Sequence, residues 1–209
     1  ALSRLRDGNR RFVSGAPKHR SPATPARRDE LLDGQEPFAI ILGCSDSRVP
    51  AELVFDQGLG DLFVIRVAGN IVAPSQVGSI EFAAARYGTR LVVVLGHTRC
   101  GAVQATLEEI GRPTETRSPN LRSIVSRIMP VVESIPMADL GDDPDRIADL
   151  VIRANVRASA DHLRHGSAIL EQLIRDEGLV VVGAEYSLET GMVDFFDGLP
   201  AAPDGGSTA

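Results

Sequence analysis

The chain has 209 residues, of which 43% are hydrophobic and 24% charged, and it carries a formal net charge of −6. This size suits a single domain with a hydrophobic core of its own. The acidic balance argues against a nucleic-acid surface, which needs an excess of Lys and Arg. Apolar runs such as residues 91–96 are far shorter than the roughly 20 residues that cross a bilayer, so we expect no membrane segment.

The N-terminal 35 residues are expected to form a helix followed by an arm. Residues 2–13 place apolar side chains near one face and arginines on the other, which predicts an amphipathic helix. Residues 15–25 are polar and contain prolines, which predicts an extended arm. Because such an arm buries little by itself, we expect the arm to lie across a partner subunit, and residues 1–35 are assigned as an N-terminal helix and dimerisation arm.

The chain begins at Ala1 rather than at methionine, and no export signal follows. Its two cysteines, Cys44 and Cys100, are too few for a disulfide-rich secreted scaffold of this length. We therefore expect a cytoplasmic protein, either trimmed at its start or forming one domain of a longer chain.

Residues 36–198 are predicted to form one α/β domain with a mostly parallel sheet flanked by helices. Runs rich in Val, Ile and Leu predict four buried parallel strands, at residues 38–43, 62–67, 91–96 and 179–184. Helical patterns lie between and after them, at residues 77–87, 102–110, 121–135 and 145–176, the last with a break. Residues 186–196 predict a hairpin that adds an antiparallel edge strand. Residues 199–209, rich in Pro, Gly and Ala, predict a disordered tail.

Reactive side chains follow two of the predicted strands. Cys44, Asp46 and Arg48 come directly after the first, and His97 and Cys100 follow the third. Open α/β sheets bind ligands just beyond the carboxyl ends of their strands, so neighbouring strands would bring these residues together. Two thiolates and an imidazole suit Zn²⁺, and three protein ligands leave a fourth position for water. The pattern predicts one zinc ion per subunit.

The role of Asp46 stays open on chemical grounds. Two residues beyond Cys44, it has the reach to bind the metal and close the site as a fourth ligand. It also has the reach to pair with Arg48, and a bidentate ion pair would fix its direction. Either cysteine alone is equally well explained as a small buried apolar residue. The combination of both strand ends with an acid–Arg pair favours a metal centre.

At these residues the sequence resembles the β-carbonic anhydrases. The resemblance rests on Cys44-Ser-Asp46-Ser-Arg48, His97-x-x-Cys100-Gly101, Arg66-x-x-Gly-Asn70 and Gly78-Ser-Ile-Glu-Phe82. It covers most of the chain, and the motifs together are highly specific. One subgroup with a regulatory bicarbonate site has a tryptophan three residues before the first cysteine. Here that residue is Ile41 and the chain has no Trp, which places it closer to the plant-type subgroup.

The resemblance implies reversible hydration of CO₂ to bicarbonate and a proton by attack of zinc-bound hydroxide. Zinc would be held by Cys44, His97 and Cys100, with Asp46 and Arg48 as a catalytic dyad. In a closed form of the site, Asp46 would bind zinc instead. The family also implies a homodimer or tetramer with active sites at the subunit interface.

The resemblance further implies a set of substrate-binding residues. Gln35 stands where plant-type members place a glutamine that positions CO₂ or bicarbonate. Phe63, Ala68 and Phe82 fall where the family lines an apolar CO₂ pocket, and Phe82 replaces a tyrosine of the plant-type enzymes. Gly101, next to the last ligand, completes the set. Without the resemblance, Gln35 would pass as a loop residue and the apolar residues as core.

Three other functions are compatible with the same residues. The zinc site is equally suited to hydrolysis of carbon disulfide or carbonyl sulfide, which some proteins with such a site perform. A permanently closed site would suit a non-catalytic bicarbonate or pH sensor, for example as a domain of a transporter. A redox role would need Cys44 and Cys100 to form a disulfide, although zinc would occupy both thiolates.

Overall fold

The computed structural model describes residues 1–18, 24–111, 118–136 and 143–200. Its centre is a five-stranded sheet in the order β2-β1-β3-β4-β5. Strands β1 (Ala39–Gly43), β2 (Leu62–Arg66), β3 (Leu91–His97) and β4 (Val180–Tyr186) are parallel, and β5 (Val193–Asp197) pairs antiparallel with β4. The predicted single α/β domain with four parallel strands and an antiparallel edge strand is therefore confirmed.

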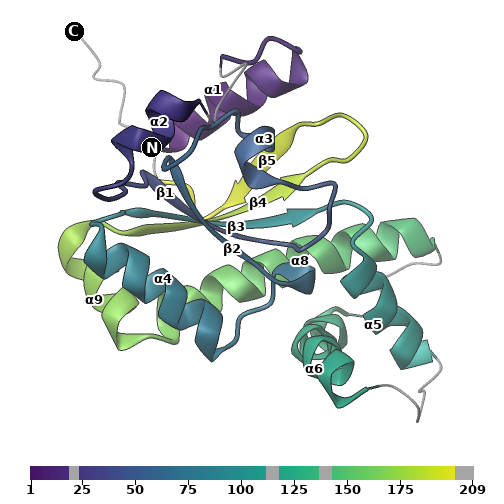
Figure 1. Ribbon diagram of the computed structural model, residues 1–209. Helices are drawn as coiled ribbons and strands as arrows, with labels where there is room; N and C mark the ends of the chain where they lie inside the picture. Colours follow the sequence, from purple (N-terminus) through teal and green to yellow (C-terminus); the bar gives the residue numbers. More distant parts are fainter. Residues whose placement is uncertain (19–23, 112–117, 137–142, 201–209) are drawn as a thin grey trace, which may run out of the picture.

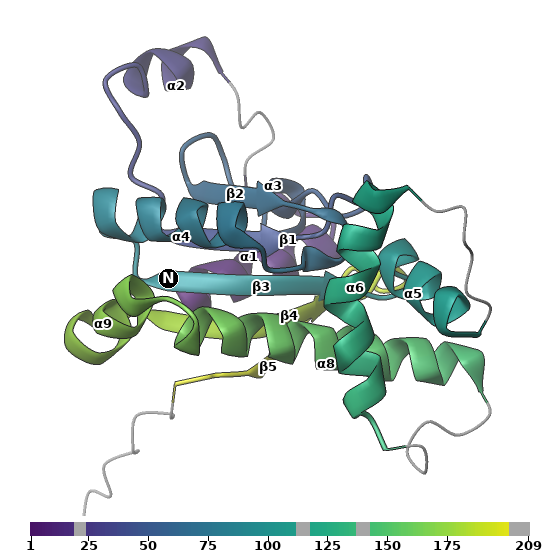
Figure 2. The ribbon, with the colours of Figure 1, turned by 90° about the horizontal axis from the view of Figure 1, so that it is seen from below.

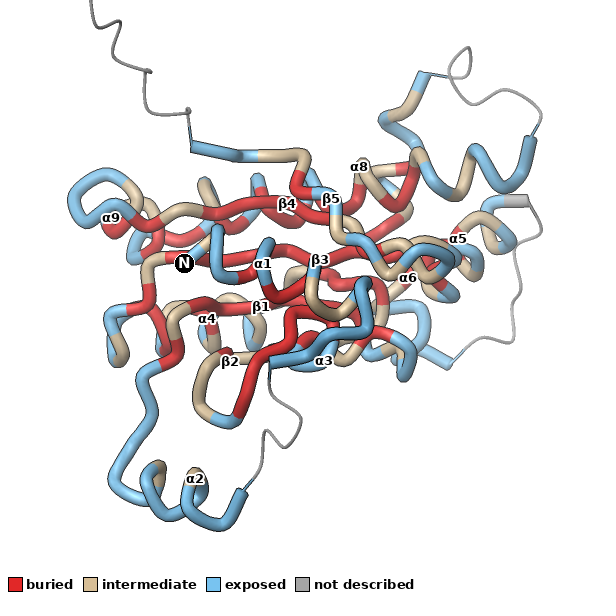
Figure 3. Tube along the Cα trace, turned by 90° about the horizontal axis from the view of Figure 1, so that it is seen from above, coloured by how far each residue is buried: buried red, intermediate tan, exposed pale blue. Residues whose placement is uncertain are grey.

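Helices cover both faces of the sheet (Figure 1). Alternate side chains along β1 and β3 point to opposite faces, so each face has its own buried cluster. On one face, α1 (Leu2–Val13) and α3 (Ala51–Val54) pack on Ile41 and Val93. On the other face, the covering helices are α4 (Pro74–Arg86), α8 (Pro144–His165) and α9 (Ala168–Glu177). The inner strands β1, β3 and β4 are accordingly buried along most of their length, whereas the edge strands β2 and β5 are mostly half-buried (Figure 3).

Local signals explain where the helices begin and end. The predicted break in residues 145–176 lies between α8 and α9, where Gly166 ends one helix and the Ser167 hydroxyl accepts from the Leu170 amide to begin the next. Helix α4 begins at Pro74, three residues before the predicted start, because proline is favoured in the first helical turn. Helix α5 (Gly101–Gly111) and helix α6 (Pro119–Ser134) lie beyond the carboxyl end of β3.

The N-terminal region divides into two parts. Helix α1 packs on its own sheet, with Leu5 fully buried and the Asn9 amide bonded to the carbonyls of Val54 and Gly191. Helix α2 (Pro25–Glu30) is exposed and stands away from the sheet (Figure 2). The expectation that residues 1–35 lie across a partner stays a prediction for both helices, and in α1 only the face that carries Leu5 and Asn9 is occupied by the chain's own residues.

Two expectations lie largely outside the described residues. They concern the extended arm, of which residues 19–23 are not described, and the tail, of which residues 201–209 are not described. None of the described helices combines the length and the apolar composition that crossing a bilayer requires.

Candidate metal centre

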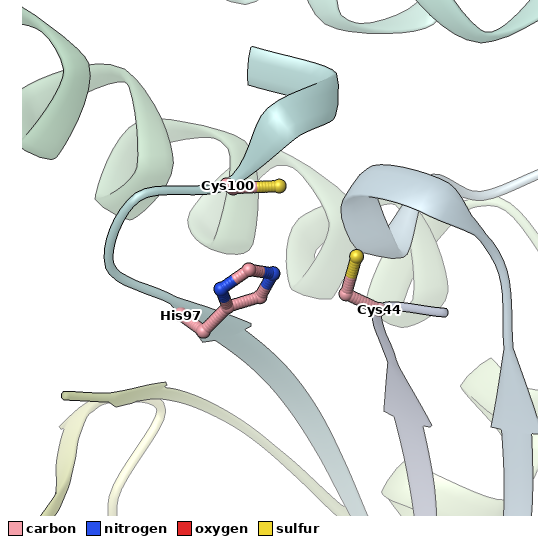
Figure 4. Close-up of side chains that lie close together, drawn as sticks. All are labelled: Cys44, His97 and Cys100. Carbon is pink, nitrogen blue, oxygen red and sulfur yellow. The ribbon is translucent and has the colours of Figure 1, made fainter. Parts of the chain in front are cut away.

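The metal-ligand candidates meet at the carboxyl ends of β1 and β3. These strands are paired neighbours, so Cys44 directly after β1 lies beside His97 at the end of β3. Cys100 follows in the loop before α5. Figure 4 shows the three side chains facing one another. One ligand atom from each lies within 4.8 Å of the other two, and all three residues are buried.

The loop between His97 and Cys100 needs an unusual backbone conformation. Arg99 has φ +56°, in the left-handed region that a non-glycine residue seldom adopts. The loop is held by the Thr98 amide, which donates to the Tyr186 carbonyl at 3.0 Å. The Arg99 carbonyl accepts from the guanidinium of Arg48 at 3.3 Å. The two strand ends are thus tied together around the ligand cluster.

The orientation of His97 suits metal binding. Its Nδ1 lies 2.9 Å from the Thr98 carbonyl, so this nitrogen carries the proton and donates it to that oxygen. The other nitrogen, Nε2, is buried and has no hydrogen-bond partner among the described residues. A buried polar atom without a partner is costly unless a ligand completes it. With two sulfurs beside it, this nitrogen fits a soft ion such as Zn²⁺.

The electrostatics of the cluster favour a cation. A hydrogen bond from Cys100 stabilises the Cys44 thiolate and, despite the opposing effect of burial, lowers the pKa of Cys44 to about 4. Donating that bond, together with burial, raises the pKa of Cys100. Burial by itself would lower the pKa of His97, but the Cys44 thiolate raises it overall. The three groups therefore share protons that a bound metal would displace.

Asp46 is engaged by Arg48 at both carboxylate oxygens. Arg48 Nε donates to Oδ1 at 2.9 Å and Nη2 to Oδ2 at 2.7 Å. The Arg48 hydrogen bond lowers the pKa of Asp46 well below its usual range. Oδ2 lies 3.9 Å from His97 Nε2, next to the ligand cluster but outside it. Of the two roles open to Asp46, the structure has the ion pair with Arg48.

The predicted substrate-binding residues fall into two groups. Ala68 begins the short turn η1 (Ala68–Asn70) beside Cys44, and Gly101 begins α5 next to Cys100. The other three lie toward the amino ends of the strands. There the Phe63 and Phe82 rings are 6.4 Å apart, and the Gln35 amide donates to the Tyr87 hydroxyl at 3.1 Å. Within one chain, this second group does not join the metal centre.

Sequence reasoning missed several residues that support the site. Arg66 donates to the carbonyls of Cys44 and Asp46, and the Gly69 amide donates to the Cys44 sulfur at 3.3 Å. Both belong to the Arg66-x-x-Gly-Asn70 motif, which entered only as part of the resemblance. Tyr87, the partner of Gln35, gave no signal beyond its place at the end of a predicted helix.

Comparison with known proteins agrees with this geometry. The family model described as "Carbonic anhydrase" matches residues 39–193. Carbonic anhydrase 2 of Mycobacterium tuberculosis is 40% identical over 191 residues, which cover 91% of this chain and 89% of that protein.

Two solved structures share the fold. The β-carbonic anhydrase CafA of Aspergillus fumigatus superimposes with a TM-score of 0.75 at 24% identity, over 95% of this chain and 92% of that one. A tetrameric β-carbonic anhydrase of Sordaria macrospora gives a TM-score of 0.69 at 25% identity, over 88% and 90% of the two chains.

Proposed function

This chain is an enzyme that belongs to the β-class carbonic anhydrases, and we propose that it catalyses the zinc-dependent, reversible hydration of CO₂ to bicarbonate and a proton. The observation that carries the proposal is the buried convergence of Cys44, His97 and Cys100 next to the Asp46–Arg48 pair. When bound, zinc in a three-ligand site supplies a Lewis acid that makes a hydroxide nucleophile available near neutral pH.

In this proposal the residues around the cluster orient the reactants. Arg48 keeps Asp46 ionised and aims its carboxylate, so that Oδ2 accepts a hydrogen bond from the nucleophile beside His97. Ala68 supplies an apolar wall next to Cys44. Arg66 fixes the backbone on both sides of the first ligand. We propose that Asp46 becomes a fourth ligand only in a closed form, in which it leaves Arg48.

We further propose that a second copy of the chain completes the substrate pocket. Strand β2 lies at the edge of the sheet, and no described strand pairs with its outer side. Near it, apolar side chains are exposed, among them Phe82 at 53%, whose ring packs against Phe63 of β2, and Leu59 at 39%, three residues before the strand. An isologous dimer at this edge would bring the partner's amino-end group, with Gln35 and Phe63, to this chain's metal centre.

The second copy gives a homodimer, and two such dimers give a tetramer. The tetrameric relative from Sordaria macrospora makes the larger assembly a reasonable form for this chain. In either assembly, α2 would lie across the partner.

The test is stopped-flow CO₂ hydration from pH 6.5 to 9 on protein whose zinc content has been measured. We expect activity in proportion to zinc. A fully zinc-loaded protein that is inactive throughout this range would contradict the proposal. Assays with carbonyl sulfide and carbon disulfide on the same sample would then separate a sulfur-substrate hydrolase from a non-catalytic sensor.

A further inference from the structure

We propose that Asn155 of α8 is a positioning residue that tunes the metal centre through the turn Ala68–Asn70. The inference rests on the proposed zinc site and concerns how that site is held. Asn155 itself touches none of the three ligand candidates through a hydrogen bond among the described residues. Its effect passes through Gly69, which lies between Asn155 and Cys44.

The turn that follows β2 has an unfavourable backbone conformation. Two consecutive residues are left-handed, Gly69 with φ +70° and Asn70 with φ +43°. Position 69 also requires glycine for space, because a Cβ there would lie 2.9 Å from Ile128 Cδ1 and 3.0 Å from Ala102 Cβ. Such a conformation persists only where neighbouring groups hold it.

The neighbouring groups are two buried polar side chains of α8. Asn155 Nδ2 donates to the Gly69 carbonyl at 2.8 Å, and Ser159 Oγ donates to the Asn70 carbonyl at 3.2 Å. Four residues apart, both side chains lie on one face of the helix. They are only 3% and 5% exposed. The helix therefore holds both left-handed residues by their carbonyl oxygens.

Holding the Gly69 carbonyl also fixes the Gly69 amide on the other side of the same Cα. That amide donates to Cys44 Sγ at 3.3 Å, and this bond is one of the causes that lower the pKa of Cys44. A hydrogen bond to a thiolate sulfur withdraws electron density from it, so the sulfur donates less to a bound metal. Asn155 thus adjusts the donor strength of Cys44 without touching it.

The test compares wild type with Asn155→Leu, which has a similar volume and no donor, after loading both with Co²⁺. We expect the thiolate-to-cobalt charge-transfer band to move to longer wavelength, since losing the amide bond raises the energy of the sulfur lone pairs. We also expect Zn²⁺ affinity, measured by chelator competition, to fall about 10-fold or more, the usual cost of losing a group that orients a metal ligand.

Two further variants separate positioning from general stability. Leu163→Ala, at a fully buried position farther along α8, should lower the melting temperature but leave the wavelength of the cobalt band unchanged. Ser159→Ala removes one hydroxyl and should move the band in the same direction by less. It serves as the test if Asn155→Leu does not fold.

A cobalt band that is unchanged in Asn155→Leu would overturn the inference, as would an unchanged band in Ser159→Ala if Asn155→Leu does not fold. The absence of any thiolate band in the wild type would instead contradict the proposed metal site itself.

Discussion

The two ends of the sheet differ in how complete they are. At the carboxyl ends, Cys44, His97 and Cys100 are buried, and the backbone around them is fixed by Arg48 and Arg66. At the amino ends, Phe82 is 53% exposed, and the Gln35 amide donates to the hydroxyl of the half-buried Tyr87. The carboxyl ends, here called the finished end, gather a complete ligand cluster within one chain. The amino ends, here called the unfinished end, carry exposed apolar side chains that the proposed dimer would cover.

The difference follows from what each end has to do. Metal ligands must converge in a dry place, and strand ends within one chain achieve this. A pocket for a small apolar substrate needs walls that close over it, and apolar walls left exposed on one chain indicate a second chain. Variants at the two ends test whether metal binding depends on one chain alone while the substrate pocket depends on two chains.

The largest effect is expected from Cys100→Ser. Removing one of three ligands should lower zinc affinity by more than about 100-fold, since even residues outside the ligand shell change it 10- to 100-fold. CO₂ hydration should be lost with the metal. Metal analysis after dialysis, alongside the activity assay, checks this. Gln35→Ala at the opposite end is the control and should keep its zinc; a Cys100→Ser protein with full zinc would show that the cluster is not the metal site.

The next effect is expected from Asp46→Asn. An amide cannot reproduce the bidentate pair with Arg48, and it presents no charge to orient the nucleophile. Hydration should fall about 100-fold or more, within the range for losing a positioned proton acceptor, while zinc is retained. Asp194→Asn, which breaks a partly exposed ion pair with Arg153, should leave activity unchanged. A fully active Asp46→Asn enzyme would remove Asp46 from the mechanism.

The unfinished end is tested by mixing subunits. Gln35→Ala alone should lower kcat/KM about 5- to 10-fold, the value of roughly one hydrogen bond. A mixed dimer of Gln35→Ala and Cys44→Ser chains, purified through two different tags, then holds one intact site if the glutamine comes from the partner. It should have about half of wild-type activity. If each chain used its own Gln35, the only metal-holding site would lack its glutamine, and the mixed dimer should have about 5 to 10% of wild-type activity.

The finished end is also the part that the sequence predicts well. Cys44 and His97 follow apolar runs that pair as neighbouring strands of a parallel sheet, so their convergence could be expected from the strand pattern. The amide of Gly69 could not, because a backbone donor leaves no side-chain signature and its partner Asn155 lies 86 residues away. Gln35 and Phe82 were identified by resemblance alone, since neither belongs to a pattern of one chain that indicates a site, and in the proposed dimer they act on the partner's metal centre.

The smallest effect concerns the acidic rim of the finished end. Asp149 lines a cavity of about 400 Å³ with Cys100 and Glu189. Burial, followed by the negative charge of Asp145, raises the pKa of Asp149. A carboxyl whose folded-state pKa is raised favours the folded state at low pH, and this advantage is lost as pH rises above the ordinary Asp value of about 3.9.

Asp149→Asn should therefore raise the melting temperature at pH 7 to 8, and the gain should vanish as pH falls to about 3.5. Thermal unfolding of variant and wild type across this range checks the sign. Asp161→Asn, at an exposed position farther along α8, is the control and should show no such gain. A gain from Asp149→Asn that is the same at every pH would mean that the charge of Asp149 carries no cost. The stability of the finished end would then not depend on the ionisation of Asp149.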